Sequence, residues 1–212
     1  YETVKKAYNI STVYKITGSG DVTAELVNYL DKNCKDLSER AMIYFPSGNY
    51  EIKDDNNLVL HSKVCIVGEK DTVVKMTGSN NSMLRTRKDE KVADVLIYGG
   101  TWNGDSKGKH IFEFNAATGV EIKNITLENA KTNGVMISEG SECTMENVVV
   151  KKSGNNGVQV TAKSTANIKN TTISENGKFG IGVDSESSGF EDDDITKLES
   201  IITICELLSQ RR

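Results

Sequence analysis

The chain has 212 residues, with 26 Lys and Arg against 30 Asp and Glu, so its formal charge is −4. It has no apolar run of the roughly 18 residues that a membrane-spanning helix needs, so no membrane span is expected. A mildly acidic chain without a basic cluster also argues against nucleic-acid binding. The 19 Asn, 18 Gly, 19 Val and 18 Thr beside a single Pro indicate many short strands joined by tight turns.

The first predicted region covers residues 1–40 and contains a strand and an amphipathic helix. The helix is predicted over residues 23–38, where Leu26, Leu30, Cys34 and Leu37 recur at helical spacing. We expect this helix to cover the open end of the sheet that begins with the strand at 41–45.

A repeat of 23 residues organises the middle of the chain, with equivalent strands that begin at Val120, Cys143 and Ala166. Apolar residues alternate within each strand, and the repeats show no helical pattern. One repeat cannot bury its apolar face alone, so neighbouring repeats must stack. The pattern predicts an all-β, single-stranded parallel β-helix of about five or six coils over residues 41–186.

Asn and Gly recur at fixed places in the repeat. Asn124, Asn147 and Asn170 follow the first strand of each repeat, and we interpret them as a buried structural ladder of hydrogen-bonded side chains. The equivalent glycines precede a second alternating strand; they are Gly134, Gly157 and Gly180.

The last predicted region covers residues 187–212, a polar connector followed by a second amphipathic helix with apolar residues from Ile195 to Leu208. We expect this helix to cap the other end, which makes one domain overall. Four cysteines lie far apart without a zinc-ligand spacing, so free buried thiols are favoured over two disulfides. These are Cys34, Cys65, Cys143 and Cys205.

Two motifs carry a family resemblance. The stretch IYFPSGNYEI at residues 43–52 and the stretch GGTWNGD at 99–105 resemble turns of the pectin-lyase-like superfamily. The resemblance covers residues 12–186 and implies a right-handed parallel β-helix, here a short or truncated member. It also implies association with polysaccharide, an extracellular or cell-surface location, and a bacterial or phage origin.

The polygalacturonase relatives of this family carry catalytic Asp residues around a Gly. At the matching place this chain has Asn133 and Met136, and side-chain amides cannot act as general acids. Lyases and epimerases need only a base and a group that neutralises a carboxylate. Weak catalytic candidates for such chemistry are Asp105, His110, Glu113 and Lys131, although turn or ion-pair roles explain each of them as well.

Outward residues of the second strand of each repeat should line the surface where the family binds sugar. The candidates for substrate binding are Asn115, Asn133, Ser138, Asn156, Gln159, Thr161 and Asp184. Trp102 aligns with apolar strand residues and is expected in the core. The acids are too dispersed for a convincing calcium site, so no metal or cofactor is expected.

Three functions remain open on the sequence. The favoured one is a module that binds acidic glycan along the solenoid face without polygalacturonase catalysis. The alternatives are a polysaccharide lyase or uronate epimerase, and a non-catalytic structural, adhesin or phage-fibre solenoid. The oligomeric state is not predicted.

Overall fold

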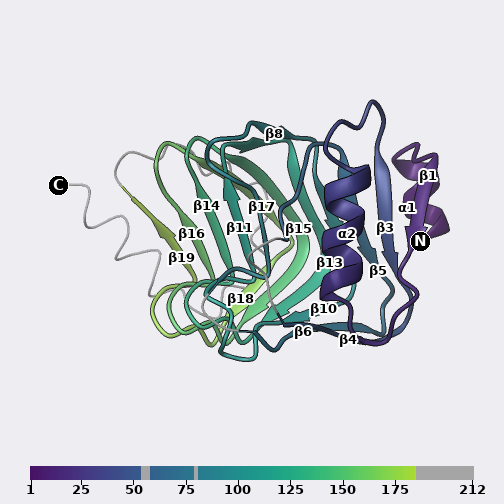
Figure 1. Ribbon diagram of the computed structural model, residues 1–212. Helices are drawn as coiled ribbons and strands as arrows, with labels where there is room; N and C mark the ends of the chain where they lie inside the picture. Colours follow the sequence, from purple (N-terminus) through teal and green to yellow (C-terminus); the bar gives the residue numbers. More distant parts are fainter. Residues whose placement is uncertain (54–57, 79–80, 185–212) are drawn as a thin grey trace.

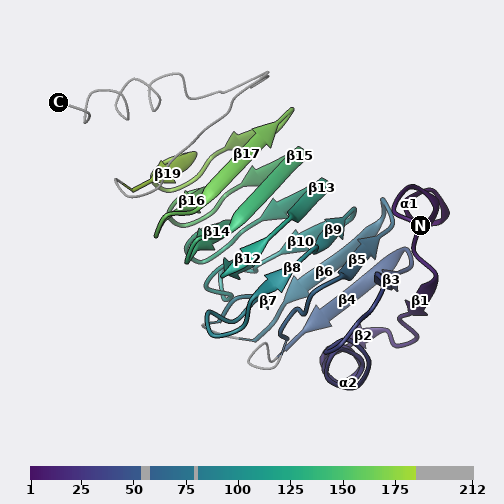
Figure 2. The ribbon, with the colours of Figure 1, turned by 90° about the horizontal axis from the view of Figure 1, so that it is seen from above.

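The computed structural model describes residues 1–53, 58–78 and 81–184. Its strands wind into a right-handed parallel β-helix of about six turns, as the repeat and the family resemblance predict (Figures 1 and 2). The predicted C-terminal helix lies outside the described residues.

The strands form a 12-stranded sheet folded into two faces, a 5-stranded sheet and a 2-stranded sheet. One face of the large sheet contains β1 (Thr12–Lys15), β3 (Ala41–Phe45), β5 (Val64–Gly68), β9 (Leu96–Tyr98), β17 (Thr165–Lys169) and the first halves of β13 (Val120–Glu128) and β15 (Glu142–Lys151). The other face contains the second halves of β13 and β15 together with β2 (Gly20–Asp21), β4 (Gly48–Ile52), β6 (Thr72–Met76), β10 (Thr101–Asn103) and β18 (Thr172–Ser174).

The 5-stranded sheet forms the third face of the solenoid. Its strands, in spatial order, are β7 (Leu84–Arg85), β11 (Phe112–Asn115), β14 (Val135–Ser138), β16 (Val158–Val160) and β19 (Ile181–Val183). The short strands β8 (Val92–Ala93) and β12 (Ala117–Thr118) pair in the turns that follow β7 and β11.

The repeat sets the register of the coils. Val120 pairs with Cys143 and Cys143 with Ala166, so residues 23 positions apart stack in one column. Pairing is interrupted at Asn124 and Asn147, where β13 and β15 bend between the two faces of the large sheet.

The asparagines at this bend differ from the expected ladder in one respect. Asn124, Asn147 and Asn170 adopt left-handed φ angles of 53°, 55° and 46°, and Asn147 Nδ2 donates to Asn124 Oδ1 at 3.2 Å. All three side chains are exposed, so the expectation of a buried ladder is wrong. The bend needs a residue that tolerates a left-handed backbone, and its side chain points to solvent.

Apolar side chains from all three faces fill one continuous core. Trp102 is fully buried there, as expected, and its indole Nε1 donates to the carbonyl of Gly99 at 3.2 Å. Its ring meets those of Phe45 and Phe112 edge to face, at centroid distances of 5.8 and 5.4 Å.

Helix α2 (Thr23–Asn33) is shorter than the predicted helix over 23–38. It ends at Asn33, and Leu37 packs against the core from the loop that turns the chain into β3. Leu26 and Leu30 of α2 are buried in the main core. Figure 2 shows α2 in line with the strands of the 5-stranded sheet, beyond β7.

A second helix, α1 (Glu2–Ala7), was not predicted. It belongs to a separate apolar cluster on the outer side of β3, β5 and β9. This cluster contains Val4, Ile10, Met42, Tyr44, Cys65, Val67 and Leu96. The thiols of Cys34, Cys65 and Cys143 are free and buried, as expected, and Cys205 lies outside the described residues.

Candidate functional site

Polar side chains run in two columns along the outward face of the 5-stranded sheet. Parallel pairing places Glu113 beside Met136, Met136 beside Gln159, and Gln159 beside Gly182. Asn115 and Ser138 begin the second column, which continues toward Thr161 and Asp184. The columns have the register expected from the sequence, and we call this surface the polar strip. Its rows are about 4.8 Å apart, the usual spacing of paired strands.

A depression of about 220 Å³ opens at the β7 end of the polar strip. Three of its residues are basic, namely Arg85, Arg87 and Lys88, and none of them is among the residues predicted from the sequence. The depression is lined by Arg85, Thr86, Arg87, Lys88, Asp89, Glu113 and Asn115. It is smaller than the roughly 300–1,000 Å³ typical of pockets for drug-sized ligands, so it suits a single small polar unit.

Hydrogen bonds fix the segment that carries these basic residues. The Thr86 hydroxyl donates to the Asn115 carbonyl at 2.8 Å and accepts from the Asn115 amide at 2.7 Å. Farther along, Glu90 Oε1 lies 3.0 Å from Nδ1 of the buried His61. The segment after β7 is therefore tied at both ends to the body of the solenoid.

Glu113 is one of two carboxylates that line the depression, the other being Asp89. Ser82, which is 1% exposed, donates its hydroxyl to Glu113 Oε2 at 2.5 Å, and Asn115 Nδ2 lies 3.4 Å from Oε1. Burial raises the pKa of Glu113, but the Ser82 hydrogen bond and nearby positive charge outweigh it and hold the pKa below its usual value. The side chain is thus ionised at neutral pH and accepts hydrogen bonds.

His110 begins a side-chain ladder that connects successive coils. Its Nδ1 accepts from the Asn133 amide at 3.3 Å, and Asn133 Oδ1 accepts from the Asn156 amide at 3.1 Å. Asn156 Oδ1 in turn accepts from the Phe179 amide at 3.1 Å. His110, Asn133 and Asn156 are 4%, 8% and 8% exposed, so these three predicted site residues have a structural role.

The ladder also limits the chemistry of His110. Burial lowers the pKa of its imidazole to about 4, so the ring is neutral at pH 7. Nδ1 faces the Asn133 amide at 3.3 Å and the Thr132 hydroxyl oxygen at 3.0 Å. Because the ring is buried and this nitrogen already has protein partners, His110 is a poor candidate for a catalytic base.

The other predicted residues lie apart from the depression. Asp105 forms ion pairs with Lys107 at 2.8 Å and Lys75 at 3.1 Å, and these hydrogen bonds hold its pKa below the usual value. Lys131 is exposed in the turn before β14. Of the predicted residues, only Glu113 and Asn115 line the depression, while Gln159, Thr161 and Asp184 extend the polar strip. Ser138 lies in the same column but is only 7% exposed.

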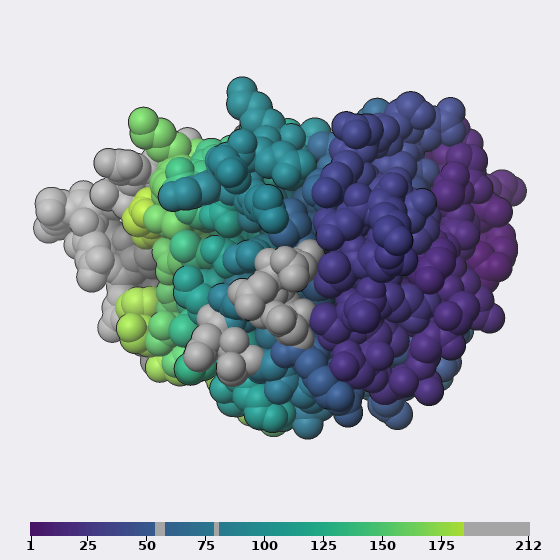
Figure 3. All heavy atoms as spheres, viewed as in Figure 1, coloured from purple at the N-terminus to yellow at the C-terminus, as the bar shows by residue number. Residues whose placement is uncertain are grey.

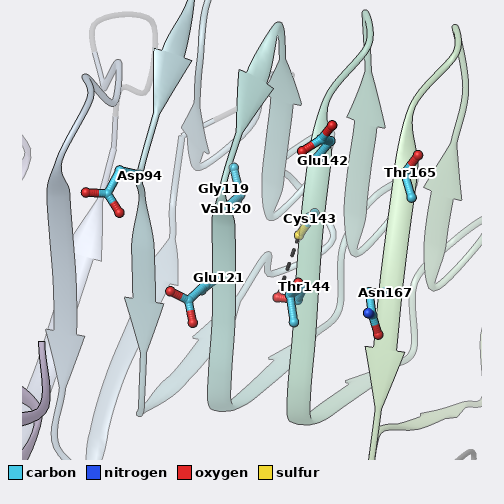
Figure 4. Close-up of a pocket in the computed structure, with 9 residues that line it drawn as sticks. All are labelled: Asp94, Gly119, Val120, Glu121, Glu142, Cys143, Thr144, Thr165 and Asn167. Carbon is cyan, nitrogen blue, oxygen red and sulfur yellow. Dashed lines mark hydrogen bonds between the residues drawn. The ribbon is translucent and has the colours of Figure 1, made fainter. Parts of the chain in front are cut away.

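A larger depression, of about 460 Å³, lies on the outer side of β13, β15 and β17 (Figure 4). Two of its carboxylates already have partners. Asp94 accepts from Arg40 Nε at 3.0 Å, and Glu121 pairs with Lys123 at 2.7 Å and accepts from the Tyr8 hydroxyl at 3.2 Å. These contacts hold the N-terminal segment in place, so we give this depression a structural role.

Two further findings concern the described residues only. No group of three or more His, Cys, Asp or Glu residues among them comes together in a way that could hold a metal ion. None of the helices in the described ranges is long and apolar enough to cross a membrane.

Comparison with known proteins supports the fold. Residues 110–203 match the family model described as a right-handed beta helix region. A comparison with curated protein sequences finds no match. Among solved structures, ORF18 of Geobacillus virus E2 is similar with a TM-score of 0.69 at 13% identity, covering 88% of this chain and 40% of the viral protein.

Two bacterial structures are also similar. A "putative glycosyl hydrolase" from Parabacteroides merdae has a TM-score of 0.66 at 14% identity, covering 85% of this chain and 95% of that protein. The A-module of the mannuronan C-5 epimerase AlgE4 from Azotobacter vinelandii has a TM-score of 0.58 at 16% identity, covering 83% of this chain and 58% of the module. At these identities the likeness concerns the fold, and the predicted resemblance to pectin-lyase-like β-helices is confirmed at that level.

Proposed function

We propose that this chain binds an acidic polysaccharide along the polar strip. The observation that carries the proposal is that the polar strip runs directly into the depression at its β7 end. Asn115, Gln159 and Thr161 are uncharged polar residues on this face that suit sugar hydroxyls, with Met136 and Gly182 in the same columns. Arg85, Arg87 and Lys88 supply positive charge for an anionic sugar substituent.

The similar solved structures support this direction. One is described as a glycosyl hydrolase and one as a mannuronan epimerase, and the third is a viral protein. An extracellular or cell-surface location and a bacterial or phage origin fit the same set, and both are part of the proposal.

Binding to immobilised pectate, alginate and a neutral glucan tests the proposal. We expect the acidic polymers to retain the protein at low salt and to release it as ionic strength rises, because the cations of the depression become screened. The neutral glucan serves as the control for general adhesion to sugar. Failure to bind any polysaccharide on a broader glycan array would contradict the proposed function.

Catalysis on the same polymers is the second candidate function. Glu113 and three cations line one depression, which places a carboxylate base near groups that could neutralise a uronate carboxylate. Ultraviolet absorbance of unsaturated products would reveal a lyase, and proton NMR of the polymer would reveal an epimerase. Any such activity should be lost in Glu113→Gln, and a variant with unchanged activity would exclude Glu113 as the base.

A further inference from the structure

The polar strip is closed at its β7 end. Val59 pairs with Arg85 and therefore takes the next place in the column of outward residues, yet it is only 4% exposed. Beyond it, α2 stands in line with the strands (Figures 1 and 2). Helix α2 buries only the face that carries Leu26 and Leu30. Because an α-helix with its side chains is about 10–12 Å thick, the remainder of α2 stands above the outer surface of the neighbouring strands.

The space-filling view agrees with this arrangement. Atoms of the N-terminal residues, α2 among them, fill the surface at this end of the molecule (Figure 3). The depression lined by Arg85, Arg87 and Lys88 thus lies at the β7 end of the strip, next to the buried Val59. A polymer lying on the strip would meet the helix if it continued past Arg85.

Three cations and two carboxylates, Asp89 and Glu113, lie together at the same end of the strip. Arg85, Arg87 and Lys88 line the depression, whereas the outward positions that follow Glu113 in its column are uncharged. Those positions are Met136, Gln159 and Gly182. Lys109, Lys131 and Lys178 lie in the turns before the strands and border one edge of the strip.

We propose that the depression holds the terminal unit of a glycan chain, and that this unit carries an anionic group. The inference rests on the proposed function and adds that the protein recognises a chain end instead of the chain interior. The anionic oxygens meet the basic side chains, among which Arg can bind a carboxylate through two parallel hydrogen bonds. Glu113 accepts hydrogen bonds from the hydroxyls of the same unit, and the following units lie along the strip toward β19.

Stoichiometry separates binding at a chain end from binding along the chain. Isothermal titration is run with a short oligogalacturonate and with a long one of defined length. End recognition predicts one protein molecule per glycan chain at both lengths, because each chain offers one suitable end. A ratio that rises with chain length would overturn the inference while leaving the proposed polysaccharide binding intact.

Charge variants test the anionic anchor. Arg87→Gln should weaken binding of the short oligogalacturonate about tenfold, the effect of losing one hydrogen bond between charged groups. Lys169→Gln is the matched control, because it removes a cation from β17 on another face and should leave the affinity unchanged. Equal affinities of the two variants would contradict the anchor. Absence of all binding in the unmodified protein would instead contradict the proposed function.

Discussion

Glycine at the turn before the 5-stranded sheet is required by close packing between coils. A Cβ atom on Gly157 would lie 2.4 Å from Ile173 Cγ2 and 2.7 Å from the carbonyl oxygen of Gly180. The same position one coil later has more room among the described residues, where a Cβ on Gly180 would meet only Ile173, at 3.5 Å or more. The repeated Gly of the sequence therefore has different importance in successive coils.

Alanine substitution should reveal this difference. Gly157→Ala should lower the free energy of unfolding by about 1–3 kcal/mol, because the new methyl group forces neighbouring backbone apart. Gly180→Ala should be neutral or slightly stabilising, since it restricts the unfolded chain without a clash. Urea unfolding followed by circular dichroism measures both, and equal losses would contradict the packing argument.

The buried imidazole of His110 should make stability depend on pH. Its pKa is about 4 in the folded chain and about 6.5 in a free side chain, so between these values the unfolded state binds more protons. Stability is then fully present above pH 6.5 and falls as the pH drops toward 4. Replacing His110 with Asn would keep a hydrogen-bond acceptor for the Asn133 amide, but the Asn side chain does not titrate.

The comparison of unmodified protein with His110→Asn isolates this contribution. We expect the free energy of unfolding of the variant to change less with pH between 6.5 and 4. Parallel pH curves for the two proteins would show that His110 does not titrate as its burial implies.

Residue chemistry explains why the prediction from the sequence assigned the buried ladder to the wrong residues. Asn124, Asn147 and Asn170 are identical and easy to align, but they lie at an exposed bend. The buried ladder uses His110, Asn133 and Asn156, which share the 23-residue spacing but begin with a His in place of Asn. Hydrogen-bond acceptance by a side chain, rather than its identity, is what recurs.

At the scale of elements, the stability of helix α1 depends on its packing against the outer side of β3, β5 and β9. It has six residues and no side-chain hydrogen bond at its N-cap, so it would be unstable as an isolated helix. Val4 packs in the cluster that covers Cys65, and Arg40 lies 4.9 Å from the ring centroid of Tyr8 at the edge of that cluster. The pattern of so short a helix is too weak to predict, whereas α2 showed several apolar residues at helical spacing.

Thiol labelling can report on the attachment of α1. Val4→Ala should speed the labelling of Cys65, whose burial raises its pKa to about 12, because a smaller side chain lets the segment open more often. Labelling of Cys34, in the main core, should not change. Lys6→Ala at an exposed position is the control, and peptide mapping identifies the labelled cysteine. Unchanged labelling of Cys65 would mean that α1 does not govern its access.

At the scale of the whole molecule, one apolar core extends from α2 to β19. Each coil contacts its neighbours, and the continuity of the core couples the stack. The fold was predictable because the coils repeat a pattern that must stack. The basic depression was not, because Arg85, Arg87 and Lys88 lie outside the aligned 23-residue repeats and meet Glu113 only through pairing of β7 with β11.

A continuous core should unfold as one unit. We expect the fluorescence of Trp102, in the N-terminal half, to follow the same urea transition as the far-ultraviolet circular dichroism of all strands. Gly157→Ala, in the C-terminal half, should move both transitions together. Separate midpoints for the two signals would show that the ends of the solenoid unfold independently.

The buried ladder also determines how the molecule could be lengthened. Its successive positions are His110, Asn133, Asn156 and Phe179. Each of the first three side chains accepts the amide of the next coil, whereas Phe179 has no acceptor to offer. Tandem duplication of residues 134–156 would add a coil that ends in Asn and would extend the polar strip by about 4.8 Å. Duplication of residues 157–179 would place Phe inside the series and leave one amide without its acceptor, so of these two segments only residues 134–156 can be repeated without that loss.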